Sequence, residues 1–429
     1  MRFLCFVFIT FFCINIHAID FKELETEKGI KFWFVQDNTI PLVSMSFSFD
    51  GGMVLDPTNK EGTTNLMTSL LDEGTQNFSS LEYKLALKES GTKIFFTTDR
   101  EKIDGTFQVV SSQLQRGFWL LQETVNVPLF NQKEISKVKK QIEASIKIDA
   151  SNVPTIASDI FNEEFFLDEK FSRKKKGTLN SLKKISRKDI KDSYRDHFNL
   201  NSLVIGVSGD ISEVNVKKYI DYVFGELPRK KNIKQTSLEN FKKGKKFIEY
   251  DTPQSSVVFG QRGLKRQDDN YFAARIANYI LGGGSFQSRL YKEIREKNGL
   301  VYSIRSYLLP LKNDGLVLGF FQTRNENVDE TLRKVIEEWD KVSKKGVTKK
   351  EFKDAKTFFK GSFSRNFTNT LSIASLLKVV QYYELGNDYF SSRDKMIDKI
   401  SLKQVNKVAG ELFNSDSLFF VIVGKKPGE

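Results

Sequence analysis

The sequence has 429 residues, with 67 Lys and Arg against 54 Asp and Glu, which gives a formal net charge of +13. This length is ample for two or more domains with cores of their own. Most Lys residues are scattered among Glu and Asp instead of forming a stripe, which favours a solvated surface and argues against binding of nucleic acid or anionic lipid.

The first 18 residues have the pattern of a secretory signal peptide. Arg2 supplies the positive start, the run from Phe3 to Ile14 is apolar but too short to span a bilayer, and Ala18 offers a cleavage site. A buried N-terminal strand is the alternative. A mitochondrial presequence would be Arg-rich and amphipathic, unlike this one. We therefore expect a secreted protein, in the bacterial periplasm, without a membrane-spanning segment once the signal is removed.

Both cysteines, Cys5 and Cys13, lie inside that segment, as does His17, one of the two histidines. The processed chain therefore has no thiol, no disulfide and no cysteine metal site. Its remaining histidine, His197, stands between a predicted helix and a predicted strand, where a packed or capping role is the expectation.

Strands and helices alternate along the first half of the chain. The expected strands are Lys31–Gln36, Leu42–Phe49, Lys93–Thr98, Gly105–Val110 and Leu203–Gly209. The expected helices are Thr64–Leu71, Ser80–Ser90, Ser112–Asn126, Gln132–Ile148 and Arg187–His197. Short turns between neighbouring strands and long helical insertions predict an α+β fold, with a mainly antiparallel sheet and helices packed on one face.

The second half repeats the first at an offset of 215 residues. Lys184-Ile185-Ser186 recurs as Lys399-Ile400-Ser401. Matches at the same offset pair Phe198-Asn199 with Phe413-Asn414, Gly209 with Gly424, and Lys31-Phe32 with Lys246-Phe247. Because the register holds at both ends of a half-chain, we predict an internal duplication. The predicted units are residues 19–227 and 244–429, joined by a polar, basic linker at 228–243.

Two consecutive segments of the second half carry a family resemblance. Leu281–Leu290 reads LGGGSFQSRL, and Glu293–Tyr302 reads EIREKNGLVY. A weaker echo runs from Gly62 to Gly74-Thr75. With these segments the chain resembles the pitrilysin/insulysin-type metallopeptidases, the inverted zincins that include mitochondrial processing peptidase. The resemblance covers essentially the whole processed chain.

The zinc motif of that family is H-x-x-E-H, and this chain has neither of its histidines nor its glutamate. The motif needs two histidines one helical turn apart on one metal, and a glutamate that deprotonates the bound water. Asn65, Thr68 and Ser69 stand in place of the first His, the Glu and the second His. The family's third ligand, a downstream Glu, falls near Ala144, and the neighbouring Glu143 is on a different helix face. We therefore expect no metal and no cofactor in this chain.

The resemblance implies a role for Arg295 and Tyr302. In the family, an Arg and a Tyr at this spacing close over the substrate and stabilise the oxyanion, and a cation with a hydroxyl donor suits that task. Gly299 between them lets a helix end and a strand begin. The first half has Leu87 and Ile94 at the corresponding positions, so the pair is not a by-product of duplication. The alternative is an ordinary surface Arg and strand Tyr.

Gly282, Gly283, Gly284, Ser285 and Phe286 form a glycine-rich loop before that pair. As a phosphate cradle the loop is weak, because no Lys-Ser/Thr follows it. A flexible turn is the plain alternative. The resemblance makes the loop the lip of a substrate chamber, where bare backbone lies close to a peptide.

Two functions remain. The chain is either the zinc-less subunit of a heterodimeric metallopeptidase, or a non-catalytic peptide-binding or scaffold relative like the core subunits of respiratory complexes. In the first case a homologous partner brings the zinc, and this chain supplies Arg295 and Tyr302 in trans to a peptide that adds to a sheet edge. The retained Arg/Tyr pair favours the first function, because a scaffold has no use for oxyanion donors.

Overall fold

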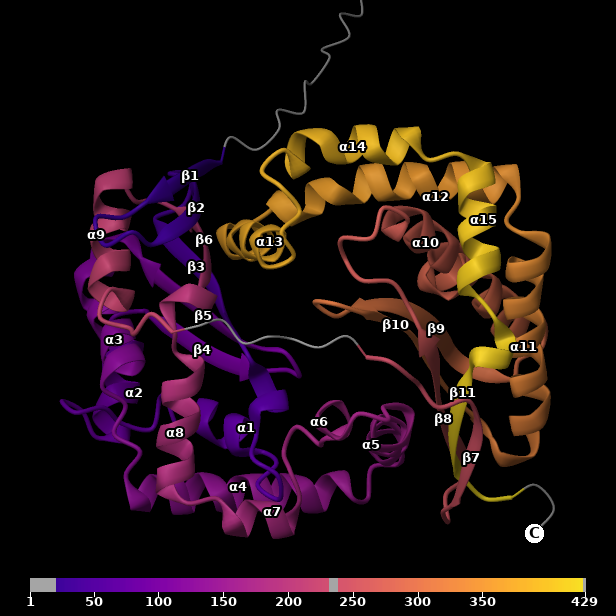
Figure 1. The fold of residues 1–429 in the computed structure, drawn as a ribbon, viewed down its shortest axis with the longest axis horizontal. Coiled ribbons are helices and arrows are strands. Elements are labelled where there is room, and N and C mark those ends of the chain that lie inside the picture. Colours follow the sequence, from indigo (N-terminus) through magenta and orange to yellow (C-terminus); the bar gives the residue numbers. More distant parts are fainter. Residues whose placement is uncertain (1–20, 231–237, 427–429) are drawn as a thin grey trace, which may run out of the picture.

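The computed structural model describes residues 21–230 and 238–426 and shows two sheets, each with its own helices (Figure 1). The predicted signal peptide, with Cys5, Cys13 and His17, lies outside the described residues, as does part of the predicted linker. The α+β fold with two similar halves is confirmed. The predicted unit boundaries at 227 and 244 stay a prediction, although all strands of one sheet precede them and all strands of the other follow.

The first sheet has six strands in the order β1-β2-β6-β3-β5-β4. Neighbours pair antiparallel, except β2 and β6, which are parallel. The strands are β1 Lys22–Glu25, β2 Lys31–Gln36, β3 Leu42–Asp50, β4 Lys93–Thr98, β5 Lys102–Val110 and β6 Val204–Gly209.

The helices of the first half follow the predicted order and add several elements. They are α1 Thr63–Thr68, α2 Ser80–Glu89, α3 Leu114–Asn126, α4 Gln132–Asp149, α5 Val153–Phe165, α6 Glu169–Ser172, α7 Leu179–Lys184, α8 Arg187–His197 and α9 Glu213–Phe224. The side chain of Ser79 caps α2 in a capping box with Glu82, and Asn131 caps α4, which satisfies backbone N–H groups that have no partner within the helix.

The second sheet has five strands in the order β7-β11-β8-β10-β9, and the outer pair β7 and β11 is parallel, as β2 and β6 are in the first sheet. Its strands are β7 Gly244–Glu249, β8 Gln254–Arg262, β9 Val301–Pro310, β10 Gly315–Arg324 and β11 Phe419–Gly424. Its helices are α10 Tyr271–Asn278, α11 Val328–Lys345, α12 Lys349–Ser362, α13 Thr370–Tyr382, α14 Tyr389–Lys399 and α15 Leu402–Leu412.

The two halves exchange one helix each. Helix α13 of the second half lies on the first sheet, across β2, β3 and β6, and helix α5 of the first half lies on the second sheet, across β8 and β11 (Figure 1). The predicted helices of each half cover one sheet face, and the exchanged helix covers part of the other face. Sequence periodicity shows that a helix has an apolar side but not which sheet receives it.

Helix α13 approaches its strand very closely. A Cβ atom built on Gly206 in β6 would lie 2.2 Å from the carbonyl oxygen of Ala374. Gln381 of α13 donates a hydrogen bond to the Ile205 carbonyl at 2.7 Å, and the hydroxyls of Ser44 and Thr370 lie 2.7 Å apart. The glycine therefore serves the contact between the halves.

Ion pairs with one buried and one half-buried partner join the halves beside α13. The Nζ atom of Lys312, in the turn between β9 and β10, pairs with Asp50 of β3 at 2.6 Å, and its backbone N–H donates to Glu101 at 2.9 Å. Lys378 of α13 pairs with Asp104 of β5 at 2.6 Å. In the described part of the chain, no helix is long and apolar enough to cross a membrane.

Candidate functional site

Arg295 and Tyr302 lie against each other where a helix leads into strand β9. The guanidinium carbon of Arg295 is 5.1 Å from the centre of the Tyr302 ring, within the range of a cation–π contact. Tyr302 is 84% exposed. Arg295 has no carboxylate partner within the described residues. The fold therefore leaves the cation and the phenol hydroxyl accessible to a ligand.

Gly299 makes the turn that brings the two side chains together. It has φ +62°, and a Cβ atom built on it would have no neighbour within 4 Å. Its N–H donates to the Arg295 carbonyl at 3.0 Å, and the Leu300 N–H donates to the Ile294 carbonyl at 3.0 Å. Glycine is needed here for its left-handed backbone and not for space.

Tyr291 links this pair to the glycine-rich loop. Arg295 donates a hydrogen bond to the Tyr291 hydroxyl, and its guanidinium carbon lies 4.8 Å from the Tyr291 ring centre. On its other side Tyr291 meets the ring of Phe286 edge-on at 4.9 Å. Sequence reasoning missed Tyr291. Its position four residues before Arg295, one helical turn away, was the signal that could have found it.

The glycine-rich loop sits between two unusual helical segments. Residues Tyr279–Gly283 and Tyr291–Lys297 form wide π-helical turns, a rare geometry that is frequent at functional sites. Ser285 between them has φ +47°, a left-handed conformation uncommon outside glycine. The local backbone therefore has two features that cluster at ligand sites.

The three glycines of the loop have different surroundings. A Cβ atom on Gly282 would lie 2.4 Å from the Ser306 hydroxyl, and one on Gly284 would lie 2.8 Å from the Tyr279 carbonyl. Both are buried, so their bare backbones hold the loop against the protein itself. Gly283, Ser285 and Phe286 are exposed, with Phe286 at 63%. Of the five loop residues, only these three are exposed at the surface.

Arg289 fixes the loop and the following helix to α12. It forms a bidentate ion pair with Glu351 at 2.8 and 2.7 Å and donates to the Gly346 carbonyl at 3.2 Å. This pairing contributes to a pKa of about 2 for Glu351, against the burial that opposes ionisation. Bidentate Arg–carboxylate pairs combine strength with fixed geometry, so the segment that carries Arg295 is held in place.

Strand β9 lies at one edge of the second sheet. Among the described strands it pairs with β10 alone, so its other edge has backbone N–H and C=O groups without a strand partner. Tyr302 is near the start of this strand. An extended peptide can add to such an edge through main-chain hydrogen bonds.

The degenerate zinc motif lies in the first half, on the short helix α1. Asn65 and Ser69 are one turn apart, and Thr68 is buried. The hydroxyls of Thr68 and Ser69 donate to the Asn65 carbonyl at 3.0 and 2.7 Å. Zinc takes thiolate, imidazole or carboxylate ligands, and these groups are an amide and two hydroxyls already engaged with the backbone. They do not fit a zinc ion.

The surroundings of α1 offer no replacement ligands. In the segments 21–230 and 238–426, no group of three or more His, Cys, Asp or Glu side chains is placed to hold a metal ion. Ala144 is exposed on α4, and Glu143 beside it is half-buried. Asp56 is engaged by the N-terminus of α1, where it accepts from the N–H groups of Gly62 and Thr64 at 2.7 and 2.8 Å.

His197 is a packed residue, as expected. It is 1% exposed at the end of α8. Its Nδ1 lies 2.7 Å from the Ser193 carbonyl and its Nε2 lies 3.1 Å from the Gly52 carbonyl. Both ring nitrogens are engaged with backbone oxygens, so the ring joins α8 to the segment after β3.

A duplicated α+β chain in which Asn65, Thr68 and Ser69 replace the zinc motif is an inactive-type relative of the inverted-zincin metallopeptidases. Two family descriptions match it: "Insulinase (Peptidase family M16)" over residues 32–179 and "Peptidase M16 inactive domain" over residues 184–359. The chain belongs to the M16 peptidase family.

Curated relatives match most of the chain. It is 26% identical to the "Non-peptidase homolog YmxG" of Helicobacter pylori, covering 97% of this chain and 96% of that one. It is 19% identical to the mitochondrial-processing peptidase subunit beta of Saccharomyces cerevisiae, covering 84% of this chain and 79% of that protein.

Solved structures share the fold. A crystal structure of a peptidase M16 inactive domain from Pseudomonas fluorescens matches with a TM-score of 0.89 at 24% identity, covering 95% of this chain and 98% of that chain. A chain of Complex III2 from Candida albicans matches with a TM-score of 0.77 at 16% identity, covering 94% and 95%.

Proposed function

We propose that this chain is the non-zinc-binding subunit of a heterodimeric zinc metallopeptidase that acts on peptides. A homologous partner chain would bring the H-x-x-E-H motif and the metal, which supplies the activated water. This chain would supply substrate contacts and Arg295 and Tyr302 in trans. The observation that carries the proposal is the Arg295–Tyr302 contact, an accessible cation and hydroxyl at the start of the edge strand β9.

The chemistry of the pair suits an amide carbonyl. Arginine stays charged at any physiological pH and has five N–H donors. Arg295 uses one donor on the Tyr291 hydroxyl, which leaves others for a carbonyl oxygen. The Tyr302 hydroxyl adds a neutral donor. Donors fixed before the reaction stabilise charge that develops on the carbonyl oxygen, because they need no reorganisation at that moment.

The edge of β9 would position the peptide. Main-chain hydrogen bonds to that edge would place one carbonyl near the start of the strand, where Tyr302 lies. Phe286 and Gly283 on the loop would contact neighbouring side chains or backbone of the peptide. Gly282 and Gly284 would act indirectly, by holding the loop.

A non-catalytic role is the second candidate. It is supported by the name of the Helicobacter pylori relative, a non-peptidase homologue, and by the fold shared with a chain of Complex III2. In this case the chain would bind peptides or hold a larger assembly together, and Arg295 and Tyr302 would contribute binding energy only.

The test uses the complex of this chain with a zinc-bearing M16 homologue encoded in the same genome. Arg295→Ala and Tyr302→Phe are expected to lower the rate of peptide hydrolysis by roughly 10²–10³-fold, with assembly and melting temperature almost unchanged. Arg333→Ala on α11, which removes an exposed arginine paired with Glu337, is the control. Equal hydrolysis by all these complexes would move the assignment to the scaffold role.

The same proposal includes export. We propose the periplasm as the compartment, on the basis of the N-terminal sequence pattern. Cell fractionation should find the chain outside the cytoplasm and shortened at its N-terminus, and a full-length cytoplasmic chain would contradict this part alone.

A further inference from the structure

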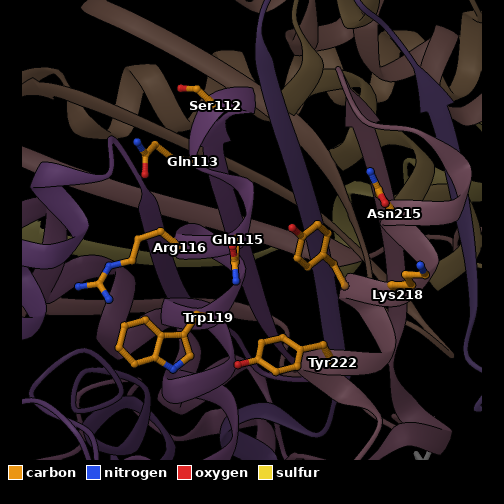
Figure 2. A pocket seen from close by; sticks show the side chains of 9 residues that line it. Ser112, Gln113, Gln115, Arg116, Trp119, Asn215, Lys218 and Tyr222 are labelled. Atoms are coloured by element: carbon orange, nitrogen blue, oxygen red, sulfur yellow. The ribbon is translucent and has the colours of Figure 1, made fainter.

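A groove runs between α3 and α9 on the first half. Its volume is about 840 Å³, and its lining includes Gln115, Arg116, Trp119, Lys218, Tyr219 and Tyr222 (Figure 2). Helices α3 and α9 pack on the sheet face opposite to α13, and Figure 1 shows them on the outer side of the molecule, away from the second half. We call this site the α3–α9 groove.

The charge of the groove has one sign. Arg116 and Lys218 line it, and no Asp or Glu does. Neither cation takes part in an ion pair within the described residues, in a chain where many Lys and Arg do. Arg116 lies instead over aromatic rings, with its guanidinium carbon 4.4 Å from the Trp119 ring centre and 5.5 Å from that of Phe78. Stacking of this kind leaves the in-plane N–H donors of arginine directed outward.

Two of the aromatic side chains of the groove pack against neighbouring rings. Tyr219 stacks on the buried Phe118 ring with centroids 4.3 Å apart and an interplanar angle of 5°. Trp119 contacts Phe78 at 5.1 Å, and Tyr222 is 46% exposed. Trp, Tyr and Arg are the residue types that dominate binding hot spots, and held rings lose little entropy when a ligand binds.

The second half of the chain shows that the fold itself does not require these residues in the groove. Helix α11 follows β10 in the second half as α3 follows β5 in the first. When the buried Phe118 and Leu121 of α3 are aligned with the buried Leu332 and Val335 of α11, Arg116 corresponds to Glu330 and Trp119 to Arg333. The second half therefore carries a charge of the opposite sign where the first has its groove cation.

We propose that the α3–α9 groove docks a short acidic segment, with an aromatic or apolar residue, from a partner protein. Carboxylates would pair with Arg116 and Lys218, and an apolar side chain would lie against Trp119 and Tyr222. The volume suits a few residues and not a folded domain. The groove is on the opposite face of the first sheet from α13, and the proposal does not depend on peptidase activity.

The test uses the full processed chain and two fluorescein-labelled peptides, Glu-Glu-Phe-Glu-Glu-Phe and its counterpart Lys-Lys-Phe-Lys-Lys-Phe. Fluorescence anisotropy should show binding of the acidic peptide only, with an affinity that falls as ionic strength rises from about 0.05 to 0.3 M, because salt screens exposed charges. Trp33 and Trp339 are buried, so a change in protein fluorescence on binding should come from Trp119 and disappear in Trp119→Phe.

Charge-reversed variants locate the site. Arg116→Glu and Lys218→Glu are each expected to weaken binding about tenfold or more, since each replaces an attraction with a repulsion. Lys403→Glu, an exposed lysine on α15, makes the same change in net charge and should leave binding unchanged. Melting curves of all variants control for folding, and the side chains of Arg116 and Lys218 reach solvent.

Three results would overturn the proposal. The first is the absence of acidic-peptide binding by the wild-type chain. The second is equal weakening by Lys403→Glu, which would mean a general charge effect. The third is self-association in sedimentation experiments that Arg116→Glu abolishes, because the occupant would then be a second copy of this chain and not a partner segment.

Discussion

Glu101 lies at the junction between the two halves, and its ionisation is expected to destabilise the folded chain. It is 6% exposed and accepts the backbone N–H of Lys312 at 2.9 Å. Burial raises its pKa from an ordinary value of 4.5 to about 7, with the nearby Asp99 and Asp50 acting in the same direction and Lys312 opposing them. The perturbation we propose is Glu101→Gln, which keeps an oxygen acceptor for Lys312 and removes the charge.

The magnitude follows from the two pKa values. One pKa unit corresponds to about 1.36 kcal/mol, so ionising Glu101 in the folded chain costs roughly 3 kcal/mol more than in the unfolded chain. Between the unfolded value of 4.5 and the folded value of about 7, the folded chain binds more protons, so the free energy of unfolding decreases as pH rises through this window. Below this pH window the carboxyl is neutral in both the folded and the unfolded chain, so the decrease in the free energy of unfolding disappears.

The assay is urea unfolding of wild type and Glu101→Gln from about pH 5 to pH 8, followed by tryptophan fluorescence. The variant should gain up to about 3 kcal/mol over wild type as pH rises through the window. Asp50 is present in both chains, so its own titration largely cancels. Glu89→Gln, at the exposed end of α2, controls for the substitution itself. A difference between wild type and Glu101→Gln that stays constant with pH would refute the reasoning.

Three further predictions concern the metal and the glycines. The purified chain should contain no stoichiometric zinc, because Asn65, Thr68 and Ser69 do not fit the ion; elemental analysis that finds about one tightly held zinc per chain would contradict this. Gly206→Ala should lower stability by about 1–3 kcal/mol in thermal unfolding, because its Cβ would overlap the backbone of α13. The control for this variant is Gly361→Ala. Gly361 lies in α12 with open space around it, so this change should be neutral or stabilising by up to about 1 kcal/mol. Gly299→Ala should cost about 1–2 kcal/mol through its left-handed backbone alone, and Gly299→Asn should cost less, because asparagine tolerates that conformation.

The sequence predicted local elements well where periodicity and caps agree. Lys31–Gln36, Lys93–Thr98 and Arg187–His197 have the expected bounds in the structure. The helix expected at Thr64–Leu71 is shorter, ending at Thr68. The hydroxyls of Thr68 and Ser69 bond to the Asn65 carbonyl at its end, and such local bonds compete with the helical ladder.

The local positions of Arg295 and Tyr302 could be predicted from the sequence, but their contacts could not, and their role stays a prediction. The spacing around Gly299 indicated a helix end and a strand start for Arg295 and Tyr302, and the structure has both. The role of Tyr291 depends on the rotamer of Arg295, which no spacing specifies. The α3–α9 groove depends on α9, a helix that was not predicted from the sequence.

The exchange of α5 and α13 has a consequence for synthesis of the chain. The first sheet is complete once Gly209 has been made, yet the helix that covers Gly206 and its neighbours ends only at Tyr382. For the whole of that interval a growing polypeptide holds an uncovered strand surface, which invites contact with other nascent chains. A chain truncated before this helix should therefore aggregate where the full one stays in solution.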